Sequence, residues 1–366
     1  MNTAARKSGG DEQHRDQQLG SVPTARFCPS DVSLTGALEF SFLMRKRQMD
    51  YLSKTQPNWP RFAGISTYAR LPHRSEPVGN GFAVFGVPFD LGSSFCSGSR
   101  FGPSAVREAS RHIRVANAFH RINIYDHVAG IDYGDAPVYP FELERSLGSI
   151  EEFVSGLVLA GTVPIGIGGD HTVSLPILRA LARASGRLSL VHFDAHSDTE
   201  NVLFGSRINH GTTFRRCAEE GLIDPQKSIQ IGMRGSTADL SEIDQARELG
   251  FEVIDSTLMN SLSIEEIVSA VKRRVAKSTA YLSFDIDFVD PAHAPGTGTP
   301  EVGGATAREA LALIRGLTDV AFAGFDLVEV SPAYDLSGIT ALLAANLVFE
   351  FISLIALRAL RERNAI

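Results

Sequence analysis

The sequence predicts an α/β protein with three layers, α/β/α, around a central and mostly parallel sheet. From about residue 81 onward, short apolar runs alternate with longer amphipathic stretches. This alternation is typical of parallel strands covered by helices on both faces. A chain of 366 residues is also long enough to bury a large core. Acidic and histidine residues follow several of the apolar runs, at the strand ends where such sheets bind ligands.

The elements follow from composition and periodicity. Apolar and β-branched runs indicate strands, and Pro103 favours the first turn of a helix. We expect strands over 82–86, 163–167, 188–193, 228–231, 251–254, 279–284 and 321–328, and helices over 103–113, 149–159, 174–184, 264–275 and 305–317. A final apolar helix over about 339–360 is interrupted by Asn346 and Glu350. We therefore expect a buried core helix there and no membrane span.

Residues 1–35 are rich in Gly, Gln, Ser and charge, which indicates a disordered or loosely docked arm. Residues 36–366 show no repeat and no dividing linker, so we expect one domain with an N-terminal extension to about residue 78. The net charge of −7 argues against a nucleic-acid binder. Three cysteines without a C-x-x-C pair, and no apolar leader segment in the arm, favour a cytoplasmic protein.

The main chemical signal is the spacing of Asp194, His196 and Asp198 after the apolar run 188–193. Alternate side chains of a strand point to the same face, so spacing by two directs all three toward one place. That place is the carboxyl end of a strand, where open α/β sheets bind ligands. Carboxylates and imidazole together suit a divalent ion of the Mn, Ni, Co, Zn or Fe type.

Two more predicted strands end in similar residues: His171 follows 163–167, and Asp285 and Asp287 follow 279–284. Four carboxylates in one crevice could not all stay ionised unaided, so two divalent cations fit better than one. Taken singly, each residue has a simpler interpretation as a turn or helix cap. His192 shares the face of Asp194, and we expect it to support a ligand or pack.

With these motifs the sequence resembles the ureohydrolase family, which includes arginase and agmatinase. The resemblance covers about residue 80 to the C-terminus. The matching segments are Gly168-Gly169-Asp170-His171, Asp194-Ala195-His196-Ser197-Asp198, Ser283-Phe284-Asp285-Ile286-Asp287 and Pro295-Gly296-Thr297-Gly298-Thr299-Pro300-Glu301. Two others, Asn209-His210-Gly211-Thr212 and Glu329-Val330-Ser331-Pro332, resemble the agmatinase branch.

The resemblance implies an arginase-like fold and two metal ions, Mn²⁺ or Ni²⁺. One ion would be held by His171, Asp194, Asp198 and Asp285, and the other by Asp194, His196, Asp285 and Asp287. Asp194 and Asp285 would then bridge the two ions, and Asp198 would also orient a hydroxide between them. A homo-oligomer (trimer or hexamer), or a hetero-oligomer with a paralogous subunit, is also implied.

The implied reaction is hydrolysis of a guanidino compound to urea and an amine or ammonia. Glu329 would hold the guanidinium, because a carboxylate binds this planar cation through paired hydrogen bonds. His210 would carry the proton that the leaving nitrogen needs. The simpler interpretations are an ordinary acid at a strand end and a loop histidine with only local hydrogen bonds.

The substrate side departs from the usual agmatinase pattern at Cys96-Ser97-Gly98-Ser99, Glu200 and His293. We therefore expect a small or substituted guanidine: free guanidine, a biguanide such as metformin, or a guanidino acid. Arg207 is a candidate partner for the carboxylate of a guanidino acid, although we favour its interpretation as a solvated loop charge. We expect Cys96 to be a small apolar filler, since the reaction needs no thiol.

Three other functions stay open. The first is agmatinase, which converts agmatine to putrescine and urea. The second is a catalytically weak partner subunit of a hetero-oligomer, although the complete ligand set counts against it. The third is zinc-dependent deacetylation on the same fold, which would use one metal and so differs in metal stoichiometry.

Overall fold

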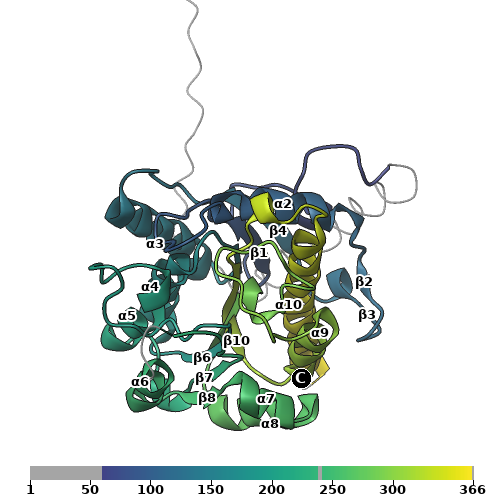
Figure 1. Ribbon diagram of the computed structural model, residues 1–366. Helices are drawn as coiled ribbons and strands as arrows, with labels where there is room; N and C mark the ends of the chain where they lie inside the picture. Colours follow the sequence, from purple (N-terminus) through teal and green to yellow (C-terminus); the bar gives the residue numbers. More distant parts are fainter. Residues whose placement is uncertain (1–59, 238–240, 365–366) are drawn as a thin grey trace, which may run out of the picture.

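A computed structural model describes residues 60–237 and 241–364 (Figure 1). The predicted arm over residues 1–35 lies outside the described residues, as does the part of the predicted extension before residue 60. The division into an arm and one domain therefore stays a prediction.

The centre of the molecule is an eight-stranded sheet in which every strand pair is parallel. The strands are β1 (Phe82–Gly86), β4 (Gly130–Asp135), β5 (Val163–Ile167), β6 (Ser189–Phe193), β7 (Ile229–Ile231), β8 (Glu252–Ile254), β9 (Ala280–Asp285) and β10 (Phe322–Val328). Their order across the sheet is β4-β1-β5-β10-β9-β6-β7-β8. A separate antiparallel hairpin joins β2 (Ala116–Asn117) and β3 (Ile122–Asn123).

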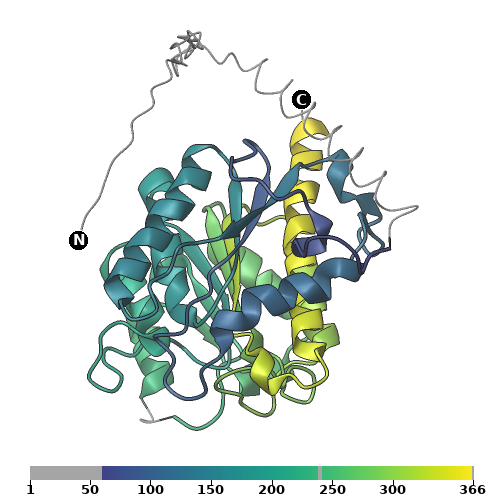
Figure 2. The same cartoon turned by 90° about the horizontal axis from the view of Figure 1, so that it is seen from above.

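Helices cover both faces of the sheet and complete the three layers (Figures 1 and 2). One layer contains α3 (Leu143–Leu159), α4 (Ser174–Ser185), α5 (Thr213–Glu219) and α6 (Glu242–Leu249); the other contains α2 (Gly102–Ala109), α8 (Ile264–Val275), α9 (Ala307–Gly316) and α10 (Ile339–Asn364), with the short α7 (Ser256–Ser261) beside β8. Each layer buries its own hydrophobic cluster against the sheet. The predicted fold class is confirmed.

Each predicted strand is present, with ends that differ by one residue at most. The strand β4 has no counterpart in the predictions, because two glycines and two aspartates hide it in Gly130–Asp135. Its Asp132 is buried and paired with Arg107. A search for runs of apolar residues cannot detect a strand that is buried through such an ion pair. The helix predicted over 103–113 is α2 followed by a 3-10 turn, Ser110–His112. The helix predicted from 149 starts earlier, at Leu143.

The final helix, α10, is long and apolar enough to cross a membrane by length and composition, but 72% of its most apolar window is buried inside the protein. Phe351 stacks on Phe325 of β10 with ring centroids 5.1 Å apart. Glu350, which interrupts the apolar run, is buried and receives hydrogen bonds from Arg315 and Asn117. These contacts agree with the prediction of a core helix.

The strand order places four strands side by side in the middle of the sheet: β5, β10, β9 and β6. Leu327 of β10 pairs with Ile167 of β5 and with Phe284 of β9, and Phe284 pairs with Phe193 of β6. These four residues form one level row across the sheet. The segments that follow the row therefore leave the carboxyl edge next to one another, and the predicted site residues lie in them.

Candidate metal centre

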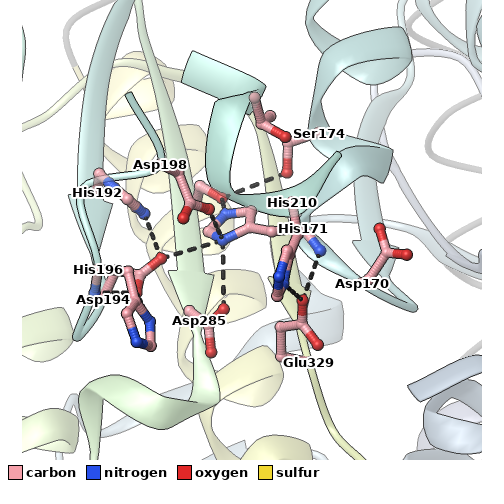
Figure 3. A network of polar contacts seen from close by, with 12 residues as sticks. Asp170, His171, Ser174, His192, Asp194, His196, Asp198, His210, Asp285 and Glu329 are labelled. Carbon is pink, nitrogen blue, oxygen red and sulfur yellow. Dashed lines mark hydrogen bonds and ion pairs between the residues drawn. The ribbon is translucent and has the colours of Figure 1, made fainter. Parts of the chain in front are cut away.

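The segment after β5 reaches the site through a tight turn. Gly169 lies against the backbone of Phe89 so closely that a Cβ atom there would be 1.5 Å from the Phe89 carbonyl oxygen. Only glycine fits this contact. Asp170 then caps the 3-10 turn His171–Val173 by accepting the N–H of Thr172. The turn directs the imidazole of His171 into the centre of the carboxyl edge (Figure 3).

The first group of donors surrounds Nδ1 of His171. Carboxylate oxygens of Asp198, Asp194 and Asp285 lie 2.9, 3.0 and 3.2 Å from this nitrogen. Nδ1 is nevertheless buried without a properly directed hydrogen bond. Burial lowers the pKa of His171, but the three carboxylates outweigh it and raise that pKa well above its usual value, so this cluster stabilises positive charge. The donor set fits a divalent cation, since carboxylates and imidazole are such an ion's usual ligands.

The second group contains Asp194, His196 and Asp287. Nδ1 of His196 lies 3.1 Å from Oδ2 of Asp287 and 3.4 Å from Oδ1 of Asp194. Asp194 therefore turns Oδ1 toward His196 and Oδ2 toward His171, as a residue shared by two ions would. Asp285 turns Oδ2 toward His171, whereas its Oδ1 accepts the N–H of Asp287. Asp285 therefore caps the following turn through Oδ1, as the simpler interpretation predicts, and contributes Oδ2 to the first group of donors.

Asp194, His196 and Asp198 converge for a different reason from the strand alternation that their spacing suggests. The strand β6 ends at Phe193, so alternation along a strand cannot orient these three residues. They lie in a loop in which Asp198 has a left-handed backbone, φ 53°. This rare conformation turns Asp198 toward His171 while His196 faces Asp287. The three side chains thus divide between the two groups.

The pKa values of the aspartates in the two groups indicate that the site binds cations. Burial, together with the charges of Asp287 and Asp194, raises the pKa of Asp285 well above its usual range. Burial and the charge of Asp194 also raise the pKa of Asp287. For Asp194 the effect of burial is outweighed by neighbouring histidines, which hold its pKa well below the usual range. A bound cation stabilises the ionised form of clustered carboxylates, so these pKa shifts favour a metal site.

A buried network behind His171 fixes its ring. Ser174, Tyr281 and Ser283 all donate their hydroxyl hydrogens to the carboxylate of Asp326. Because the Ser283 hydroxyl donates to Asp326, it accepts from Nε2–H of His171 at 2.8 Å. The contact holds a proton on Nε2, so Nδ1 is the ring nitrogen that a bound cation would meet. Partners of this kind orient metal-binding histidines.

His192 plays the supporting role that its position predicts. Gln230 donates its amide hydrogens to Nδ1 of His192 at 3.0 Å and to the carbonyl of Ser197 at 2.6 Å. Nε2–H of His192 then donates to Oδ2 of Asp194 at 2.7 Å. Although His192 lies close enough to belong to the first donor group, its ring nitrogen is directed at the Asp194 carboxylate. It therefore orients Asp194.

Beside the metal ligands, His210 and Glu329 form a buried ion pair, with 3.0 Å between Nδ1 and Oε1. Burial lowers the pKa of His210, but the hydrogen bond and charge of Glu329 outweigh it and raise that pKa to about 9. Glu329 has a left-handed backbone, φ 64°, and its Oε1 also accepts the N–H of His171. Both side chains occupy the positions that the sequence predicts.

Ser94, which sequence reasoning missed, supplies the other side of His210. Its hydroxyl lies 2.7 Å from Nε2, and its N–H points at the same nitrogen from 3.1 Å. A neutral ring can accept from this N–H, and a protonated ring can donate to the hydroxyl. The loop of Ser94 is anchored because the N–H of Gly92 donates to the buried carboxylate of Asp170 at 2.7 Å.

Asp170 is itself affected by this site, because burial and the charge of Glu329 raise its pKa to about 7.

A cavity of about 200 Å³ opens onto His210, Ser94 and three of the proposed metal ligands. Its lining comprises Ser94, His196, Asp198, Glu200, Leu203, Phe204, His210, Gly211, Asp285 and Thr299. A larger cavity, of about 400 Å³, lies near the start of β10 and the end of α10, away from both donor groups.

Arg207, His293 and Cys96 do not line this cavity. Arg207 is exposed and pairs with Glu219 at 3.0 Å, in agreement with the favoured interpretation as a solvated loop charge. His293 lies in an exposed turn, where its N–H bonds the carbonyl of Asp290. Cys96 is half-buried, and its carbonyl oxygen closely approaches Gly298.

The fold and this donor set define a class of protein: a parallel α/β protein with a binuclear type of metal site at the carboxyl edge of its sheet. The comparisons with known proteins identify the family. Residues 80–353 match the model of the arginase family, and the chain belongs to that family. The predicted ureohydrolase class is thereby confirmed. Enzymes of this family use a binuclear divalent metal centre.

Curated relatives cover most of this chain. A guanidinopropionase from Pseudomonas aeruginosa is 46% identical over 83% of this chain and 95% of its own length. The mitochondrial guanidino acid hydrolase of Homo sapiens is 41% identical over 84% and 89%. Among solved structures, proclavaminate amidino hydrolase from Streptomyces clavuligerus superposes with a TM-score of 0.79 at 40% identity, over 81% of this chain and 99% of that one.

Proposed function

We propose that this protein hydrolyses a C–N bond of a small or substituted guanidine to urea and an amine or ammonia, with two Mn²⁺ or Ni²⁺ ions bound. The observation that carries the proposal is Nδ1 of His171, which faces three carboxylates without a directed hydrogen bond, beside the Glu329–His210 pair. His171, Asp194, His196, Asp198, Asp285 and Asp287 would hold the ions. When bound, such ions lower the pKa of water and polarise a substrate.

Glu329 is the residue to which we assign guanidinium binding. Its two contacts with His171 and His210 both engage Oε1, and its Oε2 lies toward Gly298. A Cβ atom on Gly298 would lie 3.7 Å from that oxygen. The same position lies 2.6 Å from the carbonyl oxygen of Cys96, so backbone of Cys96 fills the space over Gly298. We assign guanidinium binding to Glu329 because Oε2 takes no part in the contacts with His171 and His210, and a carboxylate binds a planar guanidinium strongly.

His210 is the residue to which we assign proton delivery. In the overall reaction a water molecule adds its oxygen to the guanidino carbon, the C–N bond breaks, and the departing nitrogen takes up a proton. A pKa of about 9 keeps the His210 ring protonated at neutral pH. Ser94 offers a partner to Nε2 in both protonation states. A general acid is protonated before it donates and neutral afterwards, so a hydrogen-bond partner for both forms suits this role.

A urea-release assay tests the proposal, with Mn²⁺ or Ni²⁺ supplied in turn to metal-free protein. The compounds are guanidine, metformin, 3-guanidinopropionate, 4-guanidinobutyrate, agmatine and arginine. We expect fastest release from guanidine, metformin or one of the two guanidino acids, and slower release from agmatine and arginine. Fastest release from agmatine would favour the agmatinase alternative. Protein that binds two ions and releases no urea from any compound would favour the weak partner subunit.

We also propose a cytoplasmic homo-oligomer, a trimer or hexamer, or a hetero-oligomer with a paralogous subunit. Light scattering on purified full-length protein, alone and mixed with a paralogue, separates these states. A monomer that releases urea at full rate would contradict both forms of assembly.

A further inference from the structure

Four arginine side chains gather where helix α2 and the 3-10 turn after it end: Arg61, Arg70, Arg111 and Arg114. The guanidinium of Arg61 donates to the carbonyl of His112 at 2.8 Å. That of Arg70 donates to the next carbonyl along the chain, that of Ile113, also at 2.8 Å. Arg111 lies within the turn, and Arg114 directly follows Ile113. The four positive charges therefore lie close together, and none of them belongs to the metal centre.

The charge of this cluster is not balanced by its neighbours. Among the described residues, Glu108 is the carboxylate within ion-pair distance of the cluster, and it pairs with Arg111 at 3.1 Å. The carboxyl end of helix α2 adds about half a negative charge. Four cations thus meet roughly one and a half negative charges. In agreement with this excess, burial and the like charges of the other three arginines lower the pKa of Arg70.

The backbone that presents Arg70 is strained. Ala69 and Arg70 are consecutive residues with left-handed φ angles of 46° and 59°. This conformation is costly for residues other than glycine. The turn is held in place because the N–H of Tyr68 donates to the carboxylate of Asp132 and the N–H of Ala69 donates to the hydroxyl of Ser110, both at 2.7 Å. Strain of this kind concentrates at sites that bind ligands.

Capping of the helix end explains only part of the arrangement. A guanidinium has five N–H donors, whereas the described residues give Arg61 and Arg70 one hydrogen bond each. The Nε atoms of Arg70 and Arg111 are buried without a partner. Arg61 and Arg114 are exposed, so an ion in solution can reach them. Since a planar guanidinium binds two oxygens of a phosphate at once, the spare donors and the excess charge favour a compact oxyanion.

We propose that these four arginines form a binding site for a phosphate group, either a free ion or part of a small molecule such as a nucleoside diphosphate. A phosphate group carries about two negative charges near neutral pH, which would offset most of the excess positive charge. The site shares no residue with the metal centre or with the pair that we assign to the guanidine. The proposal therefore goes beyond guanidine hydrolysis and does not depend on it.

Calorimetric titration of inorganic phosphate into the metal-loaded full-length protein tests the site. We expect Arg61→Gln combined with Arg114→Gln to weaken binding roughly tenfold or more, because one charge-assisted hydrogen bond is worth about that factor. Both side chains are exposed, so the variant should stay folded. Unchanged affinity in this variant would place the bound phosphate elsewhere, for instance on the metal ions, and would overturn the proposal.

The matched control is Arg145→Gln combined with Arg247→Gln. These two arginines are also exposed, and they pair with Glu142 and Asp244 elsewhere on the surface. The control removes the same net charge, so the affinity for phosphate should stay within about twofold of wild type, because distant exposed charges are screened by salt. Equal losses in the two double variants would reduce the effect to net charge and contradict a specific site.

Titrations with pyrophosphate and ADP distinguish the two sources of the phosphate group. Tighter binding of ADP than of pyrophosphate would identify a nucleotide, and the reverse order would identify a free anion. Either result supports the site if Arg61→Gln combined with Arg114→Gln weakens it. No binding of phosphate, pyrophosphate or ADP by wild-type protein would contradict the proposal, whether or not the protein releases urea from a guanidine.

Discussion

The imidazole Nδ1 of His210 lies 3.0 Å from Oε1 of Glu329, and both side chains are buried at the carboxyl edge of the sheet. The carboxylate that we assign to guanidinium binding is therefore also the group that keeps His210 protonated. A guanidinium that binds Glu329 shares this negative charge with His210. Substrate binding should then lower the pKa of His210 and release its proton more readily.

The first prediction concerns pH. The protonated His210 is the active form, so activity should be lost as pH rises through its pKa. In the free enzyme that pKa is about 9, and the alkaline limb of kcat/KM should fall there. The limb of kcat reports the substrate complex, so it should fall at a lower pH. Profiles of both constants from about pH 6 to 10.5 measure the difference.

His210→Gln is the control for this profile. It should lower kcat about 100-fold, as expected for losing a general acid, and remove the alkaline limb. The metal content should not change. An alkaline limb that persists in this variant would assign the titration to another group.

The second prediction concerns Ser94. Ser94→Ala removes the hydroxyl that accepts from protonated Nε2 but keeps the backbone N–H that favours the neutral ring. The alkaline limb of kcat/KM should therefore move to lower pH, and kcat should fall by about fivefold, the worth of one hydrogen bond. Ser93→Ala is a matched control, because the buried hydroxyl of Ser93 has no hydrogen-bond partner among the described residues. A shift of the same size in both variants would refute a specific role for Ser94.

The third prediction concerns the support of His171. Ser283→Ala removes the acceptor that holds the proton on Nε2, so the affinity for one of the two ions should fall about 10- to 100-fold. Tyr281→Phe removes a different hydrogen bond to Asp326 and leaves Ser283 in place, so its effect should be smaller. Calorimetric titration of metal-free protein with Mn²⁺ measures both. Unchanged affinity in Ser283→Ala would mean that the ring orientation does not depend on this contact.

The fourth prediction concerns Asp194, whose two oxygens face different donor groups. Asp194→Ala should abolish both metal binding and urea release. Circular dichroism would show whether the variant is folded. A folded variant that retains activity would rule out the shared ligand.

The sequence predicts the central strands well because they are buried on both faces and thus continuously apolar, as in β6 and β9. It does not reveal β4, whose Asp132 is buried through an ion pair with Arg107. The two residues of this pair are distant in the sequence, so no local sequence pattern predicts that Asp132 is buried.

The metal-ligand residues could be predicted as a set, but not the cause of their convergence. Asp198 faces His171 through a left-handed backbone beyond the strand, which residue spacing does not reveal. Ser94 and Glu200 belong to loops whose approach to His210 depends on tertiary contacts. The same contacts explain why Arg207, although near His210 in sequence, pairs with Glu219.

The central claim is that two metal ions at this site allow hydrolysis of a guanidine. The most direct measurement adds Mn²⁺ or Ni²⁺ stepwise to metal-free protein and follows urea release from a small guanidine at each step. Our account predicts that the rate rises with added metal and levels off at two ions per chain. Full activity at one ion per chain, or no urea at any metal content, would contradict it.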